Sequence, residues 1–377
     1  MAQKRWEFDL LGVVIVVVAG ATAACAQPPA YPAGGGMSND HPPLRELPGL
    51  DDLIPINGPG KHGFARHSGH DSPTGPDGIP PYLTPFLPHH TGWYVQGEFL
   101  LMRPRNSDFD YVVRNLDTGL AIRGPIESLK YGVGTGFRIE TGYHFGDGNW
   151  DAAFAYTYFT SGDNSTVLAG GGILYPTLTR PGLIDRALSA TADADLDYNN
   201  FDMLAARRVQ FDDHFGLRFL GGFRFNDTKQ ILNAFYDGAD ARLARVNTRS
   251  RFQGFGPLIG VEGVMVAWHG FHLYSRAIAG LISGRNSNAV IETNDNGATT
   301  YVNTRYDVQK VVPMGSLAIG GGWQYRTLSL RAGFEVTHWQ GMFERPRVVD
   351  DVAPGKVQTR PSNLTLEGLF IQAGLNF

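Results

Sequence analysis

Residues 131–145 read YGVGTGFRIETGYHF, and this stretch decides the fold. Its odd positions, from Tyr131 to Phe145, are aromatic, aliphatic or threonine, whereas its even positions are glycine, arginine, glutamate or histidine. An alternation with a period of two predicts a β-strand rather than a helix. Strands in soluble proteins are mostly about five or six residues long. An apolar face sustained over about ten residues or more is typical of a membrane β-barrel.

The residues that follow repeat the pattern after a turn. Gly146-Asp147-Gly148 predicts a tight turn, and residues 150–160 then place Trp150, Ala152, Phe154 and further aromatic residues on one face. Two interpretations fit this hairpin: a transmembrane barrel, which we favour, and a long hairpin in a soluble sandwich. The rest of the chain distinguishes them.

The same alternation recurs along the chain, and the lengths of the connections between strands follow a rule. Short turns alternate with long polar connections at 104–130, 161–197, 227–251, 285–310 and 341–363. Short periplasmic turns and long extracellular loops are the pattern of outer-membrane barrels, whereas a sandwich has no reason to sort its loops. The sequence therefore predicts an all-β fold, a single antiparallel transmembrane β-barrel of about ten strands (10–12). The expected strands are 93–103, 131–145, 150–160, 198–209, 216–226, 255–267, 271–284, 314–325, 328–339 and 365–377.

Composition narrows the possible partners and cofactors. The 377 residues include 32 Lys and Arg and 36 Asp and Glu. The chain therefore lacks the excess of positive charge that would indicate a nucleic-acid partner. The single cysteine, Cys25, excludes an intramolecular disulfide and a cysteine-based zinc site. We expect no cofactor and no metal.

The N-terminal region divides into two segments that precede the barrel. Residues 1–26 resemble a signal peptide, with Lys4 and Arg5 before an apolar run and Ala24-Cys25-Ala26 as the cleavage site. A lipidated Cys25 is the alternative. Residues 27–90 hold 14 of the 23 prolines and six of the 11 histidines, which predicts a disordered periplasmic linker. The histidine spacing fits no fixed metal-ligand pattern. Residues 91–377 form the predicted outer-membrane barrel.

Aromatic residues and the C-terminus support a membrane location. Tryptophans gather at the short-turn ends of the predicted strands, where a girdle at the periplasmic interface is expected: Trp93, Trp150, Trp268 and Trp323, together with Tyr143. The last strand ends on Phe377 with alternate apolar residues, and such an end resembles the assembly signal read by the barrel assembly machinery.

The faces opposite the apolar ones carry charge and predict the lining of the interior. Charges of both signs in one lumen should pair, since an unpaired buried charge costs several kcal/mol. The set supports either an ion-pair plug that closes the barrel or a charged constriction that selects solutes. Its members are Glu98, Arg138, Glu140, Asp202, Arg208, Arg218, Arg224, Glu262, Arg276, Arg331 and Glu335.

Several stretches resemble one known family. The runs GWYVQGEFLLMRPR (92–105), YGVGTGFRIETGYHF (131–145), LRFLGGFRF (217–225) and LYSRAIAGLISG (273–284) are similar to the Legionella-type pore-forming major outer membrane proteins, especially relatives encoded by planctomycete bacteria. The resemblance covers about residues 91–377. It implies an outer-membrane barrel that forms a pore, and it supplies no catalytic residues.

Three functions follow as hypotheses of unequal weight. We expect a narrow porin-like channel for small solutes in contact with outer-membrane lipid. The alternative is a structural or adhesive surface barrel with an ion-pair-plugged lumen. An outer-membrane hydrolase is the least favoured, because His338 is the only candidate base near the rim and Asp350-Asp351 are loop acids. We therefore expect that the protein is not an enzyme.

Overall fold

The computed structural model describes residues 91–106, 109–116, 122–146, 149–212, 214–350, 352 and 355–377. The predicted signal peptide (1–26), the lipidation site at Cys25 and the linker (27–90) lie outside these residues. Within the described part of the chain, no helix is long and apolar enough to cross a membrane.

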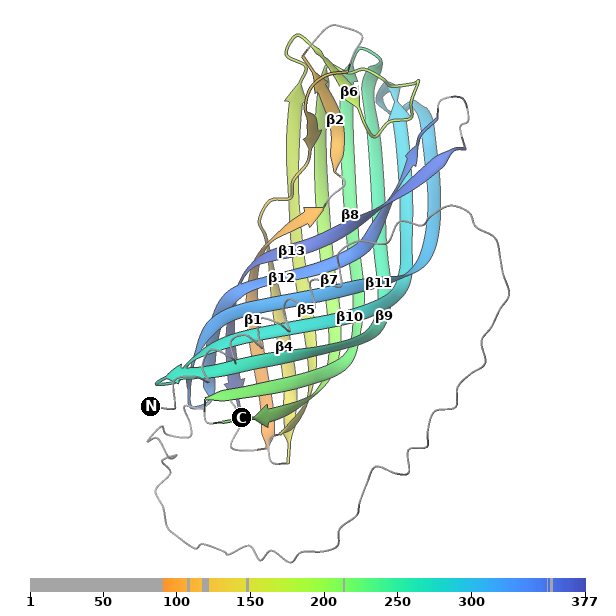
Figure 1. Cartoon of the computed structure of the whole chain (residues 1–377). Helices are drawn as coiled ribbons and strands as arrows, with labels where there is room; N and C mark the ends of the chain where they lie inside the picture. The colour runs from red at the N-terminus through yellow and green to blue at the C-terminus, as the bar shows by residue number, and fades with distance from the viewer. Residues whose placement is uncertain are drawn as a thin grey trace, which may run out of the picture.

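Ten strands pair with their neighbours and close into a ring, which confirms the predicted fold class and strand number (Figure 1). The first and last strands, β1 (Gly92–Asn106) and β13 (Val357–Asn376), pair antiparallel and seal the ring. Every other pair in the ring is antiparallel as well. The remaining barrel strands are β4 (Gly134–Phe145), β5 (Trp150–Leu168), β7 (Ser189–Gln210), β8 (Phe215–Gly238), β9 (Ala241–Trp268), β10 (Phe271–Asn294), β11 (Thr299–Tyr325) and β12 (Leu328–Val348).

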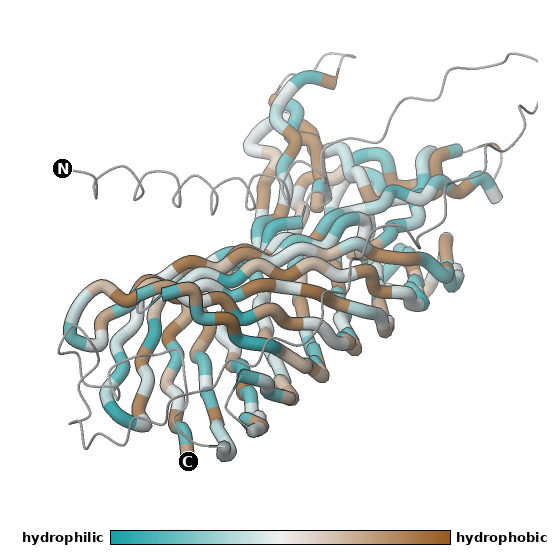
Figure 2. Tube along the Cα trace, turned by 60° about the horizontal axis from the view of Figure 1, so that its bottom comes forward, coloured by the Kyte–Doolittle hydropathy of each residue, from teal (hydrophilic) through white to brown (hydrophobic). Residues whose placement is uncertain are grey.

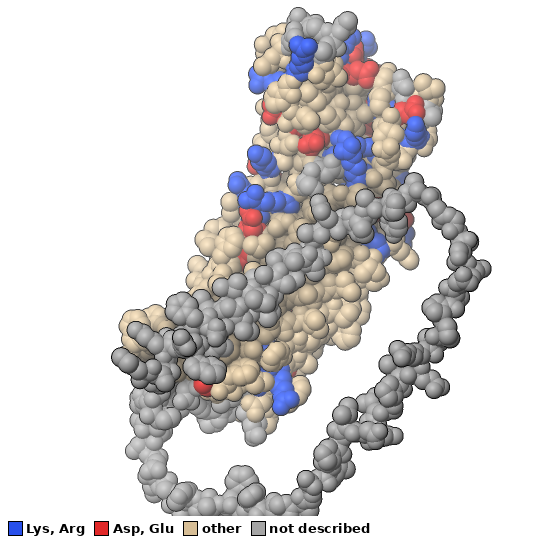
Figure 3. Space-filling view, in the orientation of Figure 1, with Lys and Arg blue, Asp and Glu red and all other residues tan. Residues whose placement is uncertain are grey.

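Side chains on the outer face are apolar around the short-turn end of the ring. Alternation of brown and teal along each strand in Figure 2 follows this inside–outside rule. Phe99, Ile259, Ile319 and Ile371 are among the large apolar side chains that remain exposed. In Figure 3 the short-turn end, at the bottom of the view, shows few charged side chains, whereas charged side chains gather over the upper part. A ring with this apolar outer surface is suited to contact with lipid.

The predicted aromatic residues lie together at the short-turn end. Trp93 pairs in register with Tyr143, and their rings meet edge to face at 5.2 Å. Trp150 lies opposite Phe145, and Phe271 lies between Trp268 and Trp323. These rings occupy the outer surface at the level where a barrel meets the membrane–water interface.

Four of the five predicted long loops are wrong as loops, because the strands continue through them. Strands β8 and β9 run through 227–251 and are joined only by residues 239–240. Connections 285–310 and 341–363 are likewise mostly occupied by the ends of β10 and β11 and of β12 and β13, and connection 161–197 is occupied at both ends by β5 and β7. A strand of about ten residues spans the membrane, so β9 with 28 residues extends far beyond it. We call this extension the long-hairpin end.

The physical reason for the error is that the polarity of the strands inverts along their length. On β7, Phe201 and Met203 face outward and Asp202 faces inward at membrane level. Farther along the same strand, Ala190, Ala192 and Ala194 are the buried residues, and Asp193 and its alternate neighbours face water. The pleat keeps the same positions inside, but the solvent outside has changed from lipid to water.

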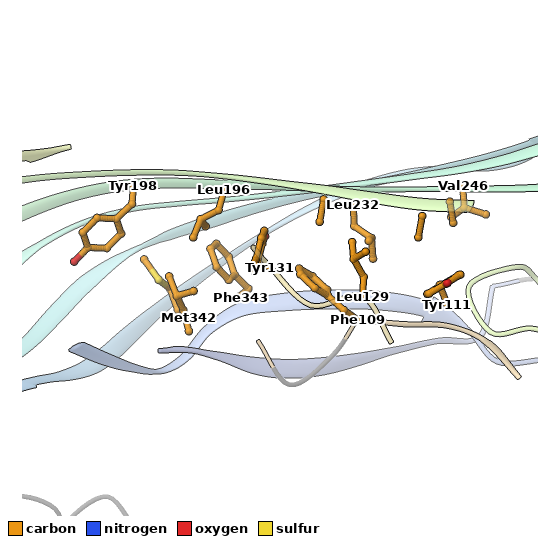
Figure 4. Close-up of a cluster of buried hydrophobic side chains, with 14 of the residues drawn as sticks. Phe109, Tyr111, Leu129, Tyr131, Leu196, Tyr198, Leu232, Val246, Met342 and Phe343 are labelled. Carbon is orange, nitrogen blue, oxygen red and sulfur yellow. The ribbon is translucent and has the colours of Figure 1, made fainter. Parts of the chain in front are cut away.

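The first long connection forms a cap instead of a loop. It contributes β2 (Asp110–Asn115) and β3 (Ile126–Ser128), which form a three-stranded sheet with β6 (Ile173–Pro176). The hydroxyl of Tyr236 on β8 donates a hydrogen bond to the carbonyl of Tyr111 at 2.6 Å. Phe109, Leu129 and Tyr131 point between the two walls of the barrel and meet Leu232 and Phe343 (Figure 4).

A buried carboxyl from the barrel wall also contacts the segment that follows β6. One Glu292 carboxylate oxygen accepts a hydrogen bond from the backbone N–H of Arg180 at 2.9 Å. Burial raises the pKa of this carboxyl to about 7, against the opposing effect of the Arg180 contacts. The cap is therefore attached to the long hairpins by polar contacts as well as by apolar packing.

The inverted polarity predicts opposite outcomes for two adjacent substitutions on β7. Ala192 is fully buried against the cap, so Ala192→Asp places a charge without a partner in the interior and should destabilise folding by about 3–5 kcal/mol. Thr191 is partly exposed on the water side, so Thr191→Asp should change stability by about 1 kcal/mol or less. Both changes in stability are measured by urea unfolding, with the folded fraction read from the band that the folded protein gives on unheated gels. Equal effects of the two changes would contradict the assigned faces.

Candidate functional site

The interior of the barrel at membrane level is a cluster of charged and hydrogen-bonding side chains. The structure places all eleven charged residues of the predicted lining on the inner face, from Glu98 on β1 to Glu335 on β12. Ten of them form ion pairs within this interior; the exception among the described residues is Arg331.

Two arginines on opposite walls share two carboxylates at the centre. Arg138 on β4 contacts Glu98 at 2.5 Å and Glu335 at 2.9 Å. Arg276 on β10 contacts Glu335 at 2.8 Å and Glu98 at 3.7 Å. Strands β4 and β10 lie five positions apart in the ring of ten, so the contacts cross the whole lumen. We call these four residues the central ion pairs.

A second group lies nearer the short-turn end and is organised around Arg218 on β8. Its guanidinium contacts Asp151 at 2.5 Å, Glu262 at 2.8 Å and Glu140 at 3.7 Å. Arg208 also approaches Asp151, at 3.7 Å. These contacts join five consecutive strands of the ring, from β9 round to β4. We call the five residues the mouth ion pairs.

A third pair lies toward the long-hairpin end. The Nε and Nη2 groups of Arg224 each donate a hydrogen bond of 2.6 Å to Asp202, in a bidentate arrangement. Above it the lining becomes aromatic and amide-rich: the indole N–H of Trp339 donates to the hydroxyl of Tyr198 at 3.2 Å. The Phe109 and Phe343 layer of the cap follows. The lumen is therefore crossed by side chains at several successive levels.

The prediction omitted three inner residues that belong to these contacts. Asp151 has a completely buried side chain. Tyr94 donates a hydrogen bond from its hydroxyl to Glu140 at 3.0 Å, and its ring stacks on the His144 ring with the centroids 4.5 Å apart. All three follow from the alternation, because Trp150 and Trp93 next to them face outward. Including Asp151, the lining has six acidic and six basic residues. The net positive charge implied by the predicted set is thus absent.

Glycine makes room for the interior side chains at particular points. A side chain on Gly142 would place its Cβ 2.5 Å from the Tyr94 ring, and one on Gly322 would overlap the His272 ring. Substitution at either position forces a buried ring to move. These glycines allow large side chains to fill a narrow barrel.

The candidate catalytic residues are not brought together. His338 lies on the outer face of β12, where its Nδ1 is 2.8 Å from the Thr365 hydroxyl. Asp350 accepts hydrogen bonds from the backbone N–H of Val352 and from the Lys356 ammonium, and Asp351 lies outside the described residues. In the described part of the chain, no group of three or more His, Cys, Asp or Glu side chains is placed to hold a metal ion.

A closed ring of antiparallel strands with an apolar, aromatic-girdled outside and a charged inside defines a transmembrane β-barrel. Residues 86–377 match the family model of the Legionella pneumophila major outer membrane protein precursor. The chain belongs to this family of outer membrane proteins, as its sequence motifs predicted. No curated protein matches the chain.

Solved structures offer only distant similarities. The outer membrane protease OmpT from Escherichia coli is 11% identical, with 76% of this chain and 97% of that chain covered and a TM-score of 0.44. A Pseudomonas aeruginosa FadL homologue is 8% identical, with coverage of 76% and 90% and a TM-score of 0.22. The Pseudomonas putida toluene transporter TodX is 10% identical, with coverage of 76% and 90% and a TM-score of 0.21. Likenesses of this strength carry no functional argument.

The central ion pairs predict a large difference between two glutamates of the barrel. Glu335→Gln removes the carboxylate shared by Arg138 and Arg276 and should destabilise folding by about 3 kcal/mol, since two buried cations lose their partner. Glu367→Gln is the control, because Glu367 pairs with an exposed arginine on the outer face, and it should cost about 1 kcal/mol or less. Urea unfolding of the refolded protein measures both. A silent Glu335→Gln would show that the central ion pairs do not hold the barrel together.

Proposed function

We propose that this protein is a structural barrel of the outer membrane, closed to solutes in its resting conformation, that displays its long hairpins at the cell surface. The central ion pairs support this proposal best, because Arg138 and Arg276 reach from opposite walls to the same two carboxylates. A ring of about eight strands is filled by side chains and open channels need about 16–18, so ten strands leave little space.

The cap supports the same proposal independently. Its side chains fill the long-hairpin end with apolar groups, and Phe109, Tyr111 and Tyr131 are almost completely buried there. A polar solute would have to cross this apolar layer as well as the ion pairs. Short turns at one end and long hairpins at the other support an extracellular position for the cap.

A narrow channel for small solutes remains the second candidate. The observation that favours it is the charged, hydrogen-bonding lining at membrane level, with a cavity of about 50 Å³ at the short-turn end. Passage would require the central ion pairs and the cap to separate. Because the lining carries equal numbers of both charges, such a channel would select weakly between anions and cations.

We further propose that the protein has no catalytic role. The separation of His338 from the acidic residues of the interior, on opposite faces of the barrel wall, supports this proposal. Activity assays against peptide and lipid substrates with the purified barrel are the direct test, and hydrolysis abolished by His338→Ala would contradict it.

Single-channel recording of the purified full chain in planar bilayers tests the proposal of a closed barrel. The wild-type protein should insert without a steady conductance. The double variant Arg138→Ala and Arg276→Ala removes both cross-lumen cations and leaves Glu98 and Glu335, so it should leak with a preference for cations. A double variant of the exposed outer residues, Arg103→Ala and Arg105→Ala, should stay closed. A steady wild-type conductance would favour the channel.

The end of the chain predicts a dependence on the assembly machinery. The backbone N–H of Phe377 donates to the carbonyl of Trp93 at 2.8 Å, while its side chain is exposed, which leaves the ring available to a partner. Deleting Phe377 should lower the amount of folded protein in outer-membrane fractions without changing synthesis. Phe377→Tyr retains an aromatic end and should assemble normally. Full assembly of the deletion variant would refute the role of this residue.

A further inference from the structure

A small cavity opens at the short-turn end of the lumen and is unusually rich in arginine. It measures about 50 Å³, and its wall includes four arginines and two glutamates: Arg208, Arg218, Arg276, Arg331, Glu140 and Glu262. A water molecule needs roughly 10–15 Å³ of such space, so the cavity accommodates about three to five non-hydrogen atoms. The cavity is therefore large enough for one small ion.

The positive charges on this wall are unequally neutralised. Arg218 contacts Glu262 and Asp151, and Arg276 contacts Glu335 at 2.8 Å. Arg208 has only Asp151, which lies 3.7 Å away and is shared with Arg218. Arg331 forms no ion pair with any residue that the structure describes. Two of the four arginines thus retain capacity for an anionic partner.

The neighbours of Arg331 hold its guanidinium group in a fixed position. Its guanidinium lies over the Tyr274 ring at 4.6 Å, and its Nη1 donates a long hydrogen bond of 3.4 Å to Gln372. Its buried Nε has no hydrogen-bond acceptor among the described residues. A buried donor without an acceptor costs free energy, and an anion that accepts from it recovers that cost.

A second buried donor lies on the same wall. The Nε of Arg276 also lacks an acceptor in the described part of the chain, although this residue is only 7% exposed. Gln96 also lines the cavity, and its side-chain oxygen already accepts from Gln372 at 2.7 Å, so its amide group remains as a neutral donor. The cavity therefore combines planar cationic donors with a neutral one, which is the donor set that oxyanions prefer.

We propose that this cavity is a binding site for a small oxyanion of the phosphate class, held by Arg331 and Arg208 from opposite walls and by the amide of Gln96. Strands β12 and β7, which carry the two arginines, lie five positions apart in the ring. The bound anion would bridge the mouth of the barrel much as Glu335 bridges its centre. The proposal goes beyond the function proposed above, because a closed barrel and a channel would both carry such a site.

Calorimetric titration of the detergent-solubilised full chain with inorganic phosphate at low ionic strength tests this site. The wild-type protein should bind one phosphate, and Arg331→Gln should weaken binding at least tenfold because it removes the cation with no carboxylate partner. Arg331→Lys keeps the charge but loses the planar fork, so binding should fall by less. Arg103→Gln, on the exposed outer face of β1, is the control and should bind like the wild type.

Three outcomes would overturn the proposal. These are no phosphate binding by the wild type, unchanged binding by Arg331→Gln, and equally tight binding of chloride, which lacks the several oxygens that the donors require. If Arg331→Gln fails to give the folded band on unheated gels, Arg208→Gln serves under the same criterion. Conductance plays no part in this test, so its result is independent of whether the barrel is open or closed.

Discussion

Closure of the sheet by pairing of β1 with β13 is the constraint on which the rest of the structure depends. The two strands pair from Tyr94 opposite Asn376 to Asn106 opposite Leu364, so neither edge of the sheet is left free at membrane level. In hydrocarbon, an unpaired backbone N–H or C=O has no water to bind, and a sheet satisfies all of these groups only as a closed ring. Closure also fixes the circumference at ten strands, and with it the small volume in which the inner side chains must find partners.

This restricted volume explains the arrangement of the interior charges. Arg138 and Glu335 cannot extend into bulk water, so their desolvation is offset by direct contacts with each other and with their neighbours. The sharing of carboxylates between opposite walls follows from the short distance across a ring of ten strands. Arg331 takes no part in this sharing, and its buried Nε has no hydrogen-bond acceptor among the described residues.

The fold was predictable from the sequence because lipid imposes one consistent rule on the outer face. Phe137, Ile139 and their alternate neighbours had to be apolar, and this marked the membrane part of each strand. The rule ends where lipid ends. Ala190, Ala192 and Ala194 alternate just as regularly, but with the apolar side inward, and under the lipid rule alone this inverted pattern predicts a polar loop. A test for either polarity would have extended β7 to Ser189.

The interior contacts were predictable only in part. Alternation identifies which residues face inward, including Asp151, but it does not indicate which of them meet. The partners of Glu335 lie on β4 and β10, far away in sequence, and their proximity depends on the stagger and circumference of the ring. The cap likewise depends on long-range packing, since Phe109 meets Phe343 only because both project into the long-hairpin end of the barrel.

The continuous pairing of the long hairpins has a consequence for digestion by proteases. Strands β8 and β9 present Lys229, Arg245, Arg249 and Arg251 on the water side, and each is a residue after which trypsin cuts. A protease binds its substrate as a free extended segment and therefore cuts mostly in loops and chain ends. Here the residues are locked in a ladder that runs to the two-residue turn, so cleavage requires the hairpin to open first. The surface can thus be rich in basic residues and still withstand enzymes that recognise them.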